Sequence, residues 1–321
     1  MNLNLLIDNL TNPALLFFLL GIIAARLKSD LEIPSNSSKF ISLYLLFSIG
    51  FKGGQELAHS HFSMDIVWSV IFGILIAICI PLYCFFLLKR KFSIENAGAI
   101  AASYGSVSAV TFVTAVSFLE IQKLNFGGHM VAVMALMEAP AIVVGVILMR
   151  LYSKKSDNAK QTKIAYVIKH SLTNGSVLLI LGSLLIGFLA SDQQAMGIKP
   201  FTNDIFKGFL AIFLLDMGIV SGKKLNDFFQ SGWFATGFAL IIPLVNGCLV
   251  AYLSQWITPD IGNRFIFAIL AASASYIAVP AAMKIVAPKA NPGLFLPMAL
   301  AVTFPLNITI GFPIYLAFIL C

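Results

Sequence analysis

Ten apolar stretches, separated by short polar or charged segments, constrain this chain more than any other feature of its sequence. A helix needs about 20 mostly apolar residues to cross the hydrocarbon core of a bilayer. A chain of 321 residues accommodates ten such helices with short connections. The sequence therefore predicts membrane-spanning helices over residues 13–27, 37–55, 65–88, 94–119, 129–151, 174–190, 203–221, 231–257, 264–286 and 291–320.

The composition fits a protein whose surface faces lipid. The chain is 59% hydrophobic and only 11% charged, whereas a soluble globular domain is about 45–50% apolar and about 25% charged. So few charges cannot cover a soluble protein of this length, which excludes a secreted, disordered or nucleic-acid-binding domain. The four cysteines have neither CxxC spacing nor histidine partners, so we interpret them as small apolar residues and expect no metal site.

The basic residues predict the orientation of the ten helices. With both termini outside the cell, 16 of the 21 Lys and Arg residues lie on the cytoplasmic side and 5 on the other. Cytoplasmic loops of membrane proteins carry this excess of positive charge. The five on the outer side are Lys52, Lys123, Lys199, Lys207 and Arg264. We therefore expect a multi-pass protein of the cell inner membrane with its central linker in the cytoplasm.

Two halves of the chain show weak self-similarity at a nearly fixed offset. The most extended match pairs Ser48-Ile-Gly-Phe-Lys-Gly-Gly-Gln-Glu-Leu57 with Asp216-Met-Gly-Ile-Val-Ser-Gly-Lys-Lys-Leu225. Five helices per half is an odd number, so the second half enters the membrane from the opposite side. The sequence predicts a first five-helix repeat over residues 1–151, a basic cytoplasmic linker over 152–172 and an inverted second repeat over 173–321. Inverted repeats are typical of secondary transporters.

Two segments predict helices that break inside the membrane. Residues 101–111 and their counterparts 271–280 carry several hydroxyls and a Gly or Pro at mid-span, where a lipid-facing helix would carry Leu and Ile. Pro280 also removes one backbone donor. Close packing of small residues is the alternative explanation. Irregular backbone at this depth survives only where protein or a wet cavity satisfies its polar groups. We therefore expect an all-α polytopic fold whose two broken helices cross at the midplane.

The broken helices favour one kind of ligand. A helix N-terminus presents free N–H groups and about half of a positive charge. Two facing termini therefore suit a small monoanion without a buried arginine. We expect Ser106, Ser108, Ser273 and Ser275 to supply hydrogen bonds to it.

On these residues the chain resembles the sodium-dependent bicarbonate transporter family of bacterial permeases. The family's Gly-x-Val-Ser-Gly-Ser-Thr stretch corresponds to Gly105-Ser-Val-Ser-Ala-Val-Thr111, and its Ala-Ser-Ser-Ser-Asp-Ile-Ser-Gly-Pro stretch to Ala272-Ser-Ala-Ser-Tyr-Ile-Ala-Val-Pro280. Its Met-Asp-x-Pro-Ala-Leu stretch appears as Met137-Glu-Ala-Pro-Ala-Ile142, and Ala-Asn-Pro as residues 290–292. These motifs occur in the same order as in the family, and the similarity extends over almost the whole chain.

The resemblance implies sodium-coupled uptake of bicarbonate by a ten-helix protein. It implies a homotrimer, with a PII-like regulatory protein that docks on the cytoplasmic face. It places substrate and ion contacts at Gly105, Ser106, Val107, Ser108, Thr111, Ser273 and Ser275.

Departures from the family pattern leave the coupling ion open. Tyr276 stands where the family has an aspartate, and Asp216 stands in an apolar stretch where relatives have an apolar residue. An acid within a membrane is costly, so Asp216 and Glu138 join Ser103, Thr111 and Tyr276 as candidate ion ligands. An organic-anion symporter, or a cation/proton antiporter using Asp216, is therefore an alternative function. An enzyme is not expected, because the chain has no HExxH or GxSxG motif.

Two charged residues at the end of the second span favour a structural explanation. Lys52 and Glu56 are spaced i,i+4, which places them on one face of a helix and predicts an ion pair between them.

Overall fold

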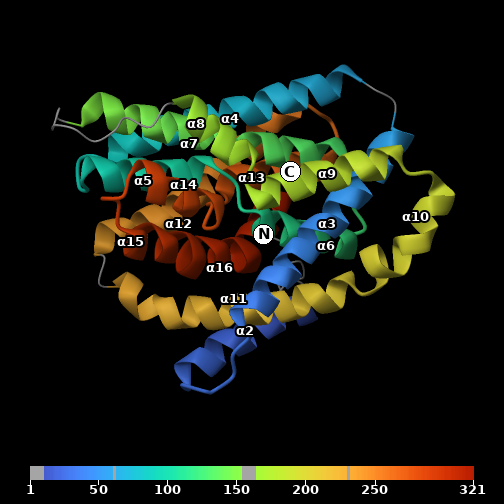
Figure 1. Ribbon diagram of the computed structural model, residues 1–321, viewed down its shortest axis with the longest axis horizontal. Coiled ribbons are helices and arrows are strands. Elements are labelled where there is room, and N and C mark those ends of the chain that lie inside the picture. Colours follow the sequence, from blue (N-terminus) through green and yellow to red (C-terminus); the bar gives the residue numbers. More distant parts are fainter. Residues whose placement is uncertain (1–10, 61–62, 154–163, 230–231) are drawn as a thin grey trace.

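The computed structural model describes residues 11–60, 63–153, 164–229 and 232–321, which form helices and no strands (Figure 1). The helices of the first half are α2 (Pro13–Arg26), α3 (Ser35–His59), α4 (Met64–Leu88), α5 (Ile94–Gly105), α6 (Ala109–Ile121) and α7 (His129–Tyr152). Those of the second half are α8 (Ile164–Leu172), α9 (Gly175–Leu189), α10 (Asp192–Lys199), α11 (Phe206–Phe229), α12 (Trp233–Leu253), α13 (Ile261–Ala272), α14 (Ala278–Val286), α15 (Pro292–Pro297), α16 (Phe304–Leu306) and α17 (Phe312–Leu320).

Six segments of the described chain are long and apolar enough to cross a membrane, which makes this a multi-pass membrane protein. They are Met64–Leu88, Ile94–Ile121, His129–Tyr152, Asp192–Leu225, Trp233–Trp256 and Pro292–Leu320. Three shorter apolar helices, α2, α9 and α13, accompany them. Within the described residues, each of the ten predicted stretches overlaps one or two of these helices, except 291–320, which contains α15, α16 and α17.

Side-chain caps explain where several helices begin. The Ser93 hydroxyl accepts the N–H of Asn96 at the start of α5, and the Asp260 carboxylate accepts the N–H of Asn263 at the start of α13. Such caps satisfy backbone donors that have no partner within the helix. Each cap directly precedes an Ile-x-Asn sequence, at residues 94–96 and 261–263.

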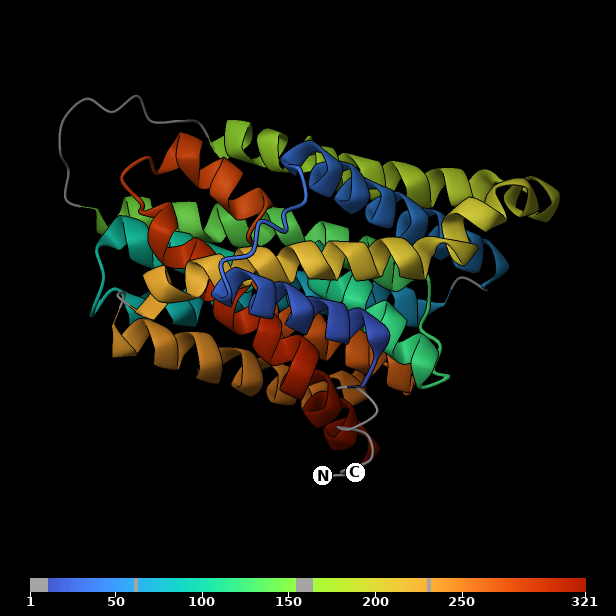
Figure 2. The same ribbon diagram turned by 90° about the horizontal axis from the view of Figure 1, so that it is seen from below.

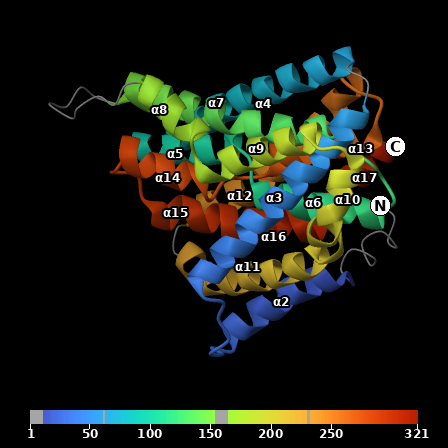
Figure 3. The same cartoon turned by 45° about the vertical axis from the view of Figure 1, so that its right-hand side comes forward.

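Glycines allow two pairs of helices to pack backbone against backbone. Gly218 on α11 lies against Gly21 on α2, and a Cβ atom at Gly218 would overlap the carbonyl oxygen of Phe18. At the second contact, a Cβ atom at Gly54 of α3 would overlap the carbonyl oxygen of Leu184 on α9. Small residues permit such close approach of helices within a membrane. Figures 1 and 3 show α2 and α11 side by side at one edge of the molecule.

The remaining helices pack in a related order in the two halves. Helix α4 packs against α5 and α7, and α12 packs against α13 and α17. Figure 2 shows the Pro13 end of α2 and the Cys321 end of α17 at the same end of the molecule. The last segment is irregular, because π-helical turns at Met298–Thr303 and Asn307–Gly311 interrupt it.

The linker predicted over residues 152–172 is helical in its second part. Residues Ile164–Leu172 form α8, and Thr173 and Asn174 separate α8 from α9. The Asn174 side chain accepts the N–H of Ser176 and caps α9. Residues 154–163 lie outside the described part of the chain.

Candidate functional site

Both predicted helix breaks are present. Helix α5 ends at Gly105 and α6 begins at Ala109, while α13 ends at Ala272 and α14 begins at Ala278. The hydroxyl of Ser108 accepts the N–H of Thr111 and caps α6. Pro280 is the third residue of α14, where a helical N–H has no partner in any case, so the proline costs the helix nothing there.

The two breaks are hydrogen-bonded to each other. The N–H of Ser108 donates to Ser273 Oγ at 3.0 Å, and the N–H of Ser275 donates to the carbonyl oxygen of Ser103 at 2.8 Å. The Ser103 hydroxyl donates to the carbonyl oxygen of Ser275. All four serines are buried, so these bonds satisfy polar groups that have no access to water. We refer to residues 103–108 and 273–277 together as the crossing.

Two asparagines satisfy the end of α13. Asn307 Nδ2 donates to the carbonyl oxygen of Ala272 at 2.8 Å, and Asn246 Nδ2 donates to that of Ala271 at 3.3 Å. The hydroxyl of Tyr315 donates to Asn307 Oδ1 at 2.9 Å and fixes the amide. These carbonyls would otherwise lack partners where the helix stops, so the asparagines stabilise the break.

A small cavity lies beside the crossing. Its volume is about 30 Å³, and both breaks contribute to its wall. We call it the central cavity. The residues that line it are Leu46, Val107, Ser108, Ala109, Met134, Ala135, Glu138, Ser176, Val177, Ile180, Ser275, Tyr276 and Ile277. One glutamate, three serines and one tyrosine thus line an otherwise mainly apolar space, with no Lys, Arg or His among the lining residues.

The structure divides the predicted site residues into two groups. The residues that line the central cavity are Val107, Ser108, Ser275, Tyr276 and Glu138. The others do not line it, and apart from Asp216 they belong to the crossing or to its immediate surroundings. Ser103 and Ser273 hold the crossing together, Thr111 donates its N–H to Ser108, and Gly105 packs against the ring of Pro81. The Ser106 hydroxyl is buried and has no hydrogen-bond partner among the described residues.

Asp216 lies away from the central cavity. The residue is 6% exposed, and its carboxylate accepts a hydrogen bond from the Ser38 hydroxyl on α3. Asp216 lines neither the central cavity nor the larger cavity of about 450 Å³ described below. Its neighbour Met217 approaches the crossing, with Sδ 3.9 Å from the hydroxyl of Tyr276. Asp216 therefore links α3 to α11.

A larger cavity of about 450 Å³ lies at the end of α3 and α6. Lys52 lines it, but the ion-pair partner of Lys52 is Glu120 on α6, with Nζ 3.7 Å from Oε1. The predicted pair with Glu56 is therefore wrong, because the nearer carboxylate comes from another helix. Lys207 on α11 reaches the other oxygen of Glu120 at 3.3 Å. Glu120 thus connects the second half of a broken helix to both α3 and α11.

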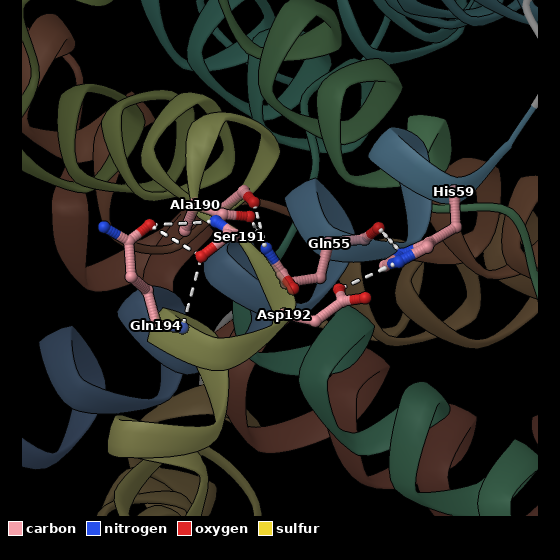
Figure 4. Close-up of polar contacts among 7 residues, drawn as sticks. Gln55, His59, Ala190, Ser191, Asp192 and Gln194 are labelled. Carbon is pink, nitrogen blue, oxygen red and sulfur yellow. Dashed lines mark hydrogen bonds and ion pairs between the residues drawn. The ribbon is translucent and has the colours of Figure 1, made fainter.

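The end of α3 is also tied to α10. Figure 4 shows His59 against Asp192, with Nε2 2.9 Å from Oδ1, and Gln55 donating to the carbonyl oxygen of Ala190 at 2.9 Å. Ser191 and Gln194 form a reciprocal cap at the start of α10. These contacts position α10 at one edge of the larger cavity, which Asp192 also lines.

One polar residue of the central cavity, Ser176, was not predicted from the sequence. Ser176 lies in the first turn of α9, and its position follows from the interruption between α8 and α9. The sequence Thr173-Asn174-Gly175 carries the signal, since Asn is a strong helix cap. A third helix therefore begins at the wall of this cavity.

The helices and the crossing define a multi-pass membrane protein with two broken helices that are hydrogen-bonded to each other, and broken helices are used by membrane transporters. A sequence model of the Na+-dependent bicarbonate transporter superfamily matches residues 13–320. The chain belongs to this family, as its resemblance predicted, and transporter membership implies a small anion substrate. No curated protein matches the chain directly.

Proposed function

We propose that this protein imports a small anion by sodium-coupled transport, with bicarbonate as the first candidate substrate, and that the anion binds in the central cavity. The observation that carries the proposal is the arrangement of the two breaks, which bring the first turns of α6 and α14 to one cavity with no basic side chain. Helix N-termini attract anions through free N–H groups and the helix dipole. Membership of the family supports bicarbonate as cargo and sodium as the coupling ion.

Within this proposal the predicted substrate residues have different roles. Ser108 and Ser275 contact the anion, and Val107 forms part of the apolar wall beside it. Each of the two hydroxyls accepts a backbone N–H at a helix start and retains its own proton for donation. Gly105, Ser106 and Ser273 shape the crossing behind the cavity.

We further propose that the protein spans the inner membrane ten times as two inverted repeats with both termini outside. The packing between the two halves supports the repeats, because it is reciprocal. Helix α2 of the first half packs on α11 of the second half, and α3 of the first half packs on α9 of the second. The two glycine contacts stand at these two interfaces. The distribution of basic residues supports the orientation. A cysteine-accessibility experiment with a reagent that does not cross membranes tests it, by comparing labels placed at Asp192 and Lys289.

Two partner predictions remain from the family resemblance. We expect a homotrimer, which mass measurement of the detergent-solubilised protein tests. We also expect a PII-like protein to bind the cytoplasmic face, which a pull-down experiment tests.

Uptake of labelled bicarbonate into liposomes that contain the purified protein tests the function. We expect a sodium gradient to stimulate uptake, and Ser108→Leu and Ser275→Leu to abolish it, because leucine fills the cavity and removes a hydroxyl. Ser254→Ala, at a hydroxyl outside the cavity that donates to the carbonyl oxygen of Ala251 in its own turn, is the control. Uptake that ignores sodium and survives both leucine variants would exclude this mechanism.

The alternative, an organic-anion symporter or a cation/proton antiporter that uses Asp216, finds less support. The hydrogen bond from Ser38 already accounts for this acid, and the residue does not line the central cavity.

A further inference from the structure

Two lysines from different helices hold one carboxylate between them at the larger cavity. Lys52 Nζ on α3 lies 3.7 Å from Glu120 Oε1, and Lys207 Nζ on α11 lies 3.3 Å from Glu120 Oε2. Lys52 also lies over the ring of Phe206, with Nζ 5.0 Å from the ring centroid. The face of an aromatic ring attracts an ammonium group, so this contact helps to hold Lys52 in place even without Glu120. We refer to Lys52 and Lys207 as the lysine pair.

The lysine pair depends on Glu120 alone for its ion pairs. No other acid among the described residues lies within ion-pair distance of either lysine. Glu120 lies near the end of α6, the helix that begins at the crossing, whereas the two lysines lie on α3 and α11. A displacement of Glu120 therefore leaves two neighbouring ammonium groups without a counter-ion.

The group that the lysine pair binds has the shape of a small planar oxyanion. A carboxylate carries one negative charge shared by two oxygens on one carbon, and bicarbonate and small carboxylates carry the same O–C–O group. Ammonium groups bind such oxygens through charge-assisted hydrogen bonds. Each oxygen of Glu120 faces a different lysine, so a free anion of this kind can take the place of the side chain.

The cavity beside the lysine pair has room for such an anion and a suitable balance of charge. Its volume is about 450 Å³. The charged residues at its wall are Lys52, Lys199, Glu56, Glu120 and Asp192, and Lys207 joins them through its pair with Glu120. Three lysines thus face three acids. With Glu120 displaced, one positive formal charge is left unbalanced, which suits a single monoanion.

We propose that Lys52 and Lys207 form a second anion site at the larger cavity, for a small planar oxyanion such as bicarbonate, and that Glu120 occupies this site in the absence of the anion. This inference rests on the proposed function for the choice of bicarbonate. The anion and Glu120 compete for the same two lysines. Binding of the anion therefore weakens the contacts of α6 with α3 and α11, and those contacts weaken anion binding to the same extent.

Titration of the purified full-length protein with ¹³C-labelled bicarbonate, followed by NMR line broadening, tests this site without relying on transport. We expect Glu120→Gln to bind bicarbonate about tenfold more tightly than the wild type, because the anion no longer competes with two ion pairs. The ionic strength is kept low and constant, since salt screens exposed charges. If the glutamine variant does not fold, Glu120→Ala removes the same carboxylate. Unchanged affinity in the folded variant overturns the proposal.

Two further variants show whether the gain comes from the lysine pair. Adding Lys207→Gln to Glu120→Gln should remove the gain, because one of the two ammonium groups is lost. Glu56→Gln is the matched control, since it removes the same charge from the same cavity without freeing a lysine. The central cavity is the same in all these proteins, so differences between them report on the larger cavity. A gain that survives Lys207→Gln, or that Glu56→Gln reproduces in full, contradicts the assignment.

The same proteins separate this inference from the proposed function. If the gain depends on Lys207 but liposomes with the wild type take up no bicarbonate, the proposed transport fails and the second site stands. If sodium-stimulated uptake is present but Glu120→Gln shows no gain, the second site fails and the proposed transport stands.

Discussion

The backbone N–H of Ser108 donates to the hydroxyl of Ser273, 3.0 Å away and 165 residues further along the chain. The bond joins the N-terminal cap of α6 to the end of α13, and both residues are buried. Ser273 Oγ in turn donates to the carbonyl oxygen of Leu270 at 2.9 Å. One side chain thus serves both broken helices.

Replacement of Ser273 by alanine should therefore destabilise the crossing. The substitution leaves the N–H of Ser108 buried without a partner, which costs about 1–3 kcal/mol. Thermal unfolding in detergent measures the loss. Ser69→Ala is the matched control, because the Ser69 hydroxyl is also buried but has no hydrogen-bond partner among the described residues. Equal stability of the two variants would show that the bond contributes nothing.

Alanine at Gly54 should destabilise the protein, although alanine is the better helix former. Its Cβ atom would overlap the carbonyl oxygen of Leu184, so α3 and α9 must separate at a cost of about 1–3 kcal/mol. Gly182 on α9 has open space at the Cβ position, so Gly182→Ala should be neutral or stabilising by up to about 1 kcal/mol. Unfolding temperatures of the two variants should move in opposite directions. A shift in the same direction would contradict the observed helix contact.

Neutralising Glu120 should have a small effect that depends on salt. Glu120 pairs with Lys52 and Lys207, but all three side chains are partly exposed, and such pairs are worth about 0–1 kcal/mol each. The stability difference between the wild type and Glu120→Gln should shrink as KCl rises, because salt screens exposed charges. Glu32→Gln, at an exposed position, serves as the control. A large difference at high salt would mean that these charges are not screened.

Asp216→Asn should preserve sodium-stimulated uptake. Asparagine can still accept the hydrogen bond from Ser38, now as a neutral group, so we expect a loss of about 1 kcal/mol in stability. Uptake assays at several pH values decide between the two proposed functions. Loss of a pH-dependent activity in this variant would instead identify Asp216 as a proton carrier.

The positions of the helices and of both breaks were predictable because they depend on local sequence. Apolar runs of about 20 residues identify the spans, and hydroxyl-rich segments with Gly105 and Pro280 identify the breaks. The cap at Asn174 is equally local and stands at the start of the predicted span 174–190, but local sequence does not show that this helix begins at the cavity. Ser176 was missed for this reason.

The partners of polar residues could not be predicted, because they depend on which helices become neighbours. The i,i+4 spacing of Lys52 favoured Glu56, yet the fold brings Glu120 from α6 within 3.7 Å. Asp216 and Glu138 are both acids in apolar sequence, and nothing local shows that one lies beside Ser38 and the other at the cavity. Sequence therefore identified the candidate acids but could not distinguish them.

The bonds between the two breaks also constrain how the protein can move. Three hydrogen bonds join the broken helices, and the bond from the Ser275 N–H to the Ser103 carbonyl oxygen involves main-chain groups alone, so no change of side-chain rotamer can release it. A displacement of one broken helix across the membrane would therefore carry the other with it as a single rigid body. An ion bound between the two broken helices would then move together with both of them, and would not be transferred from one helix to the other.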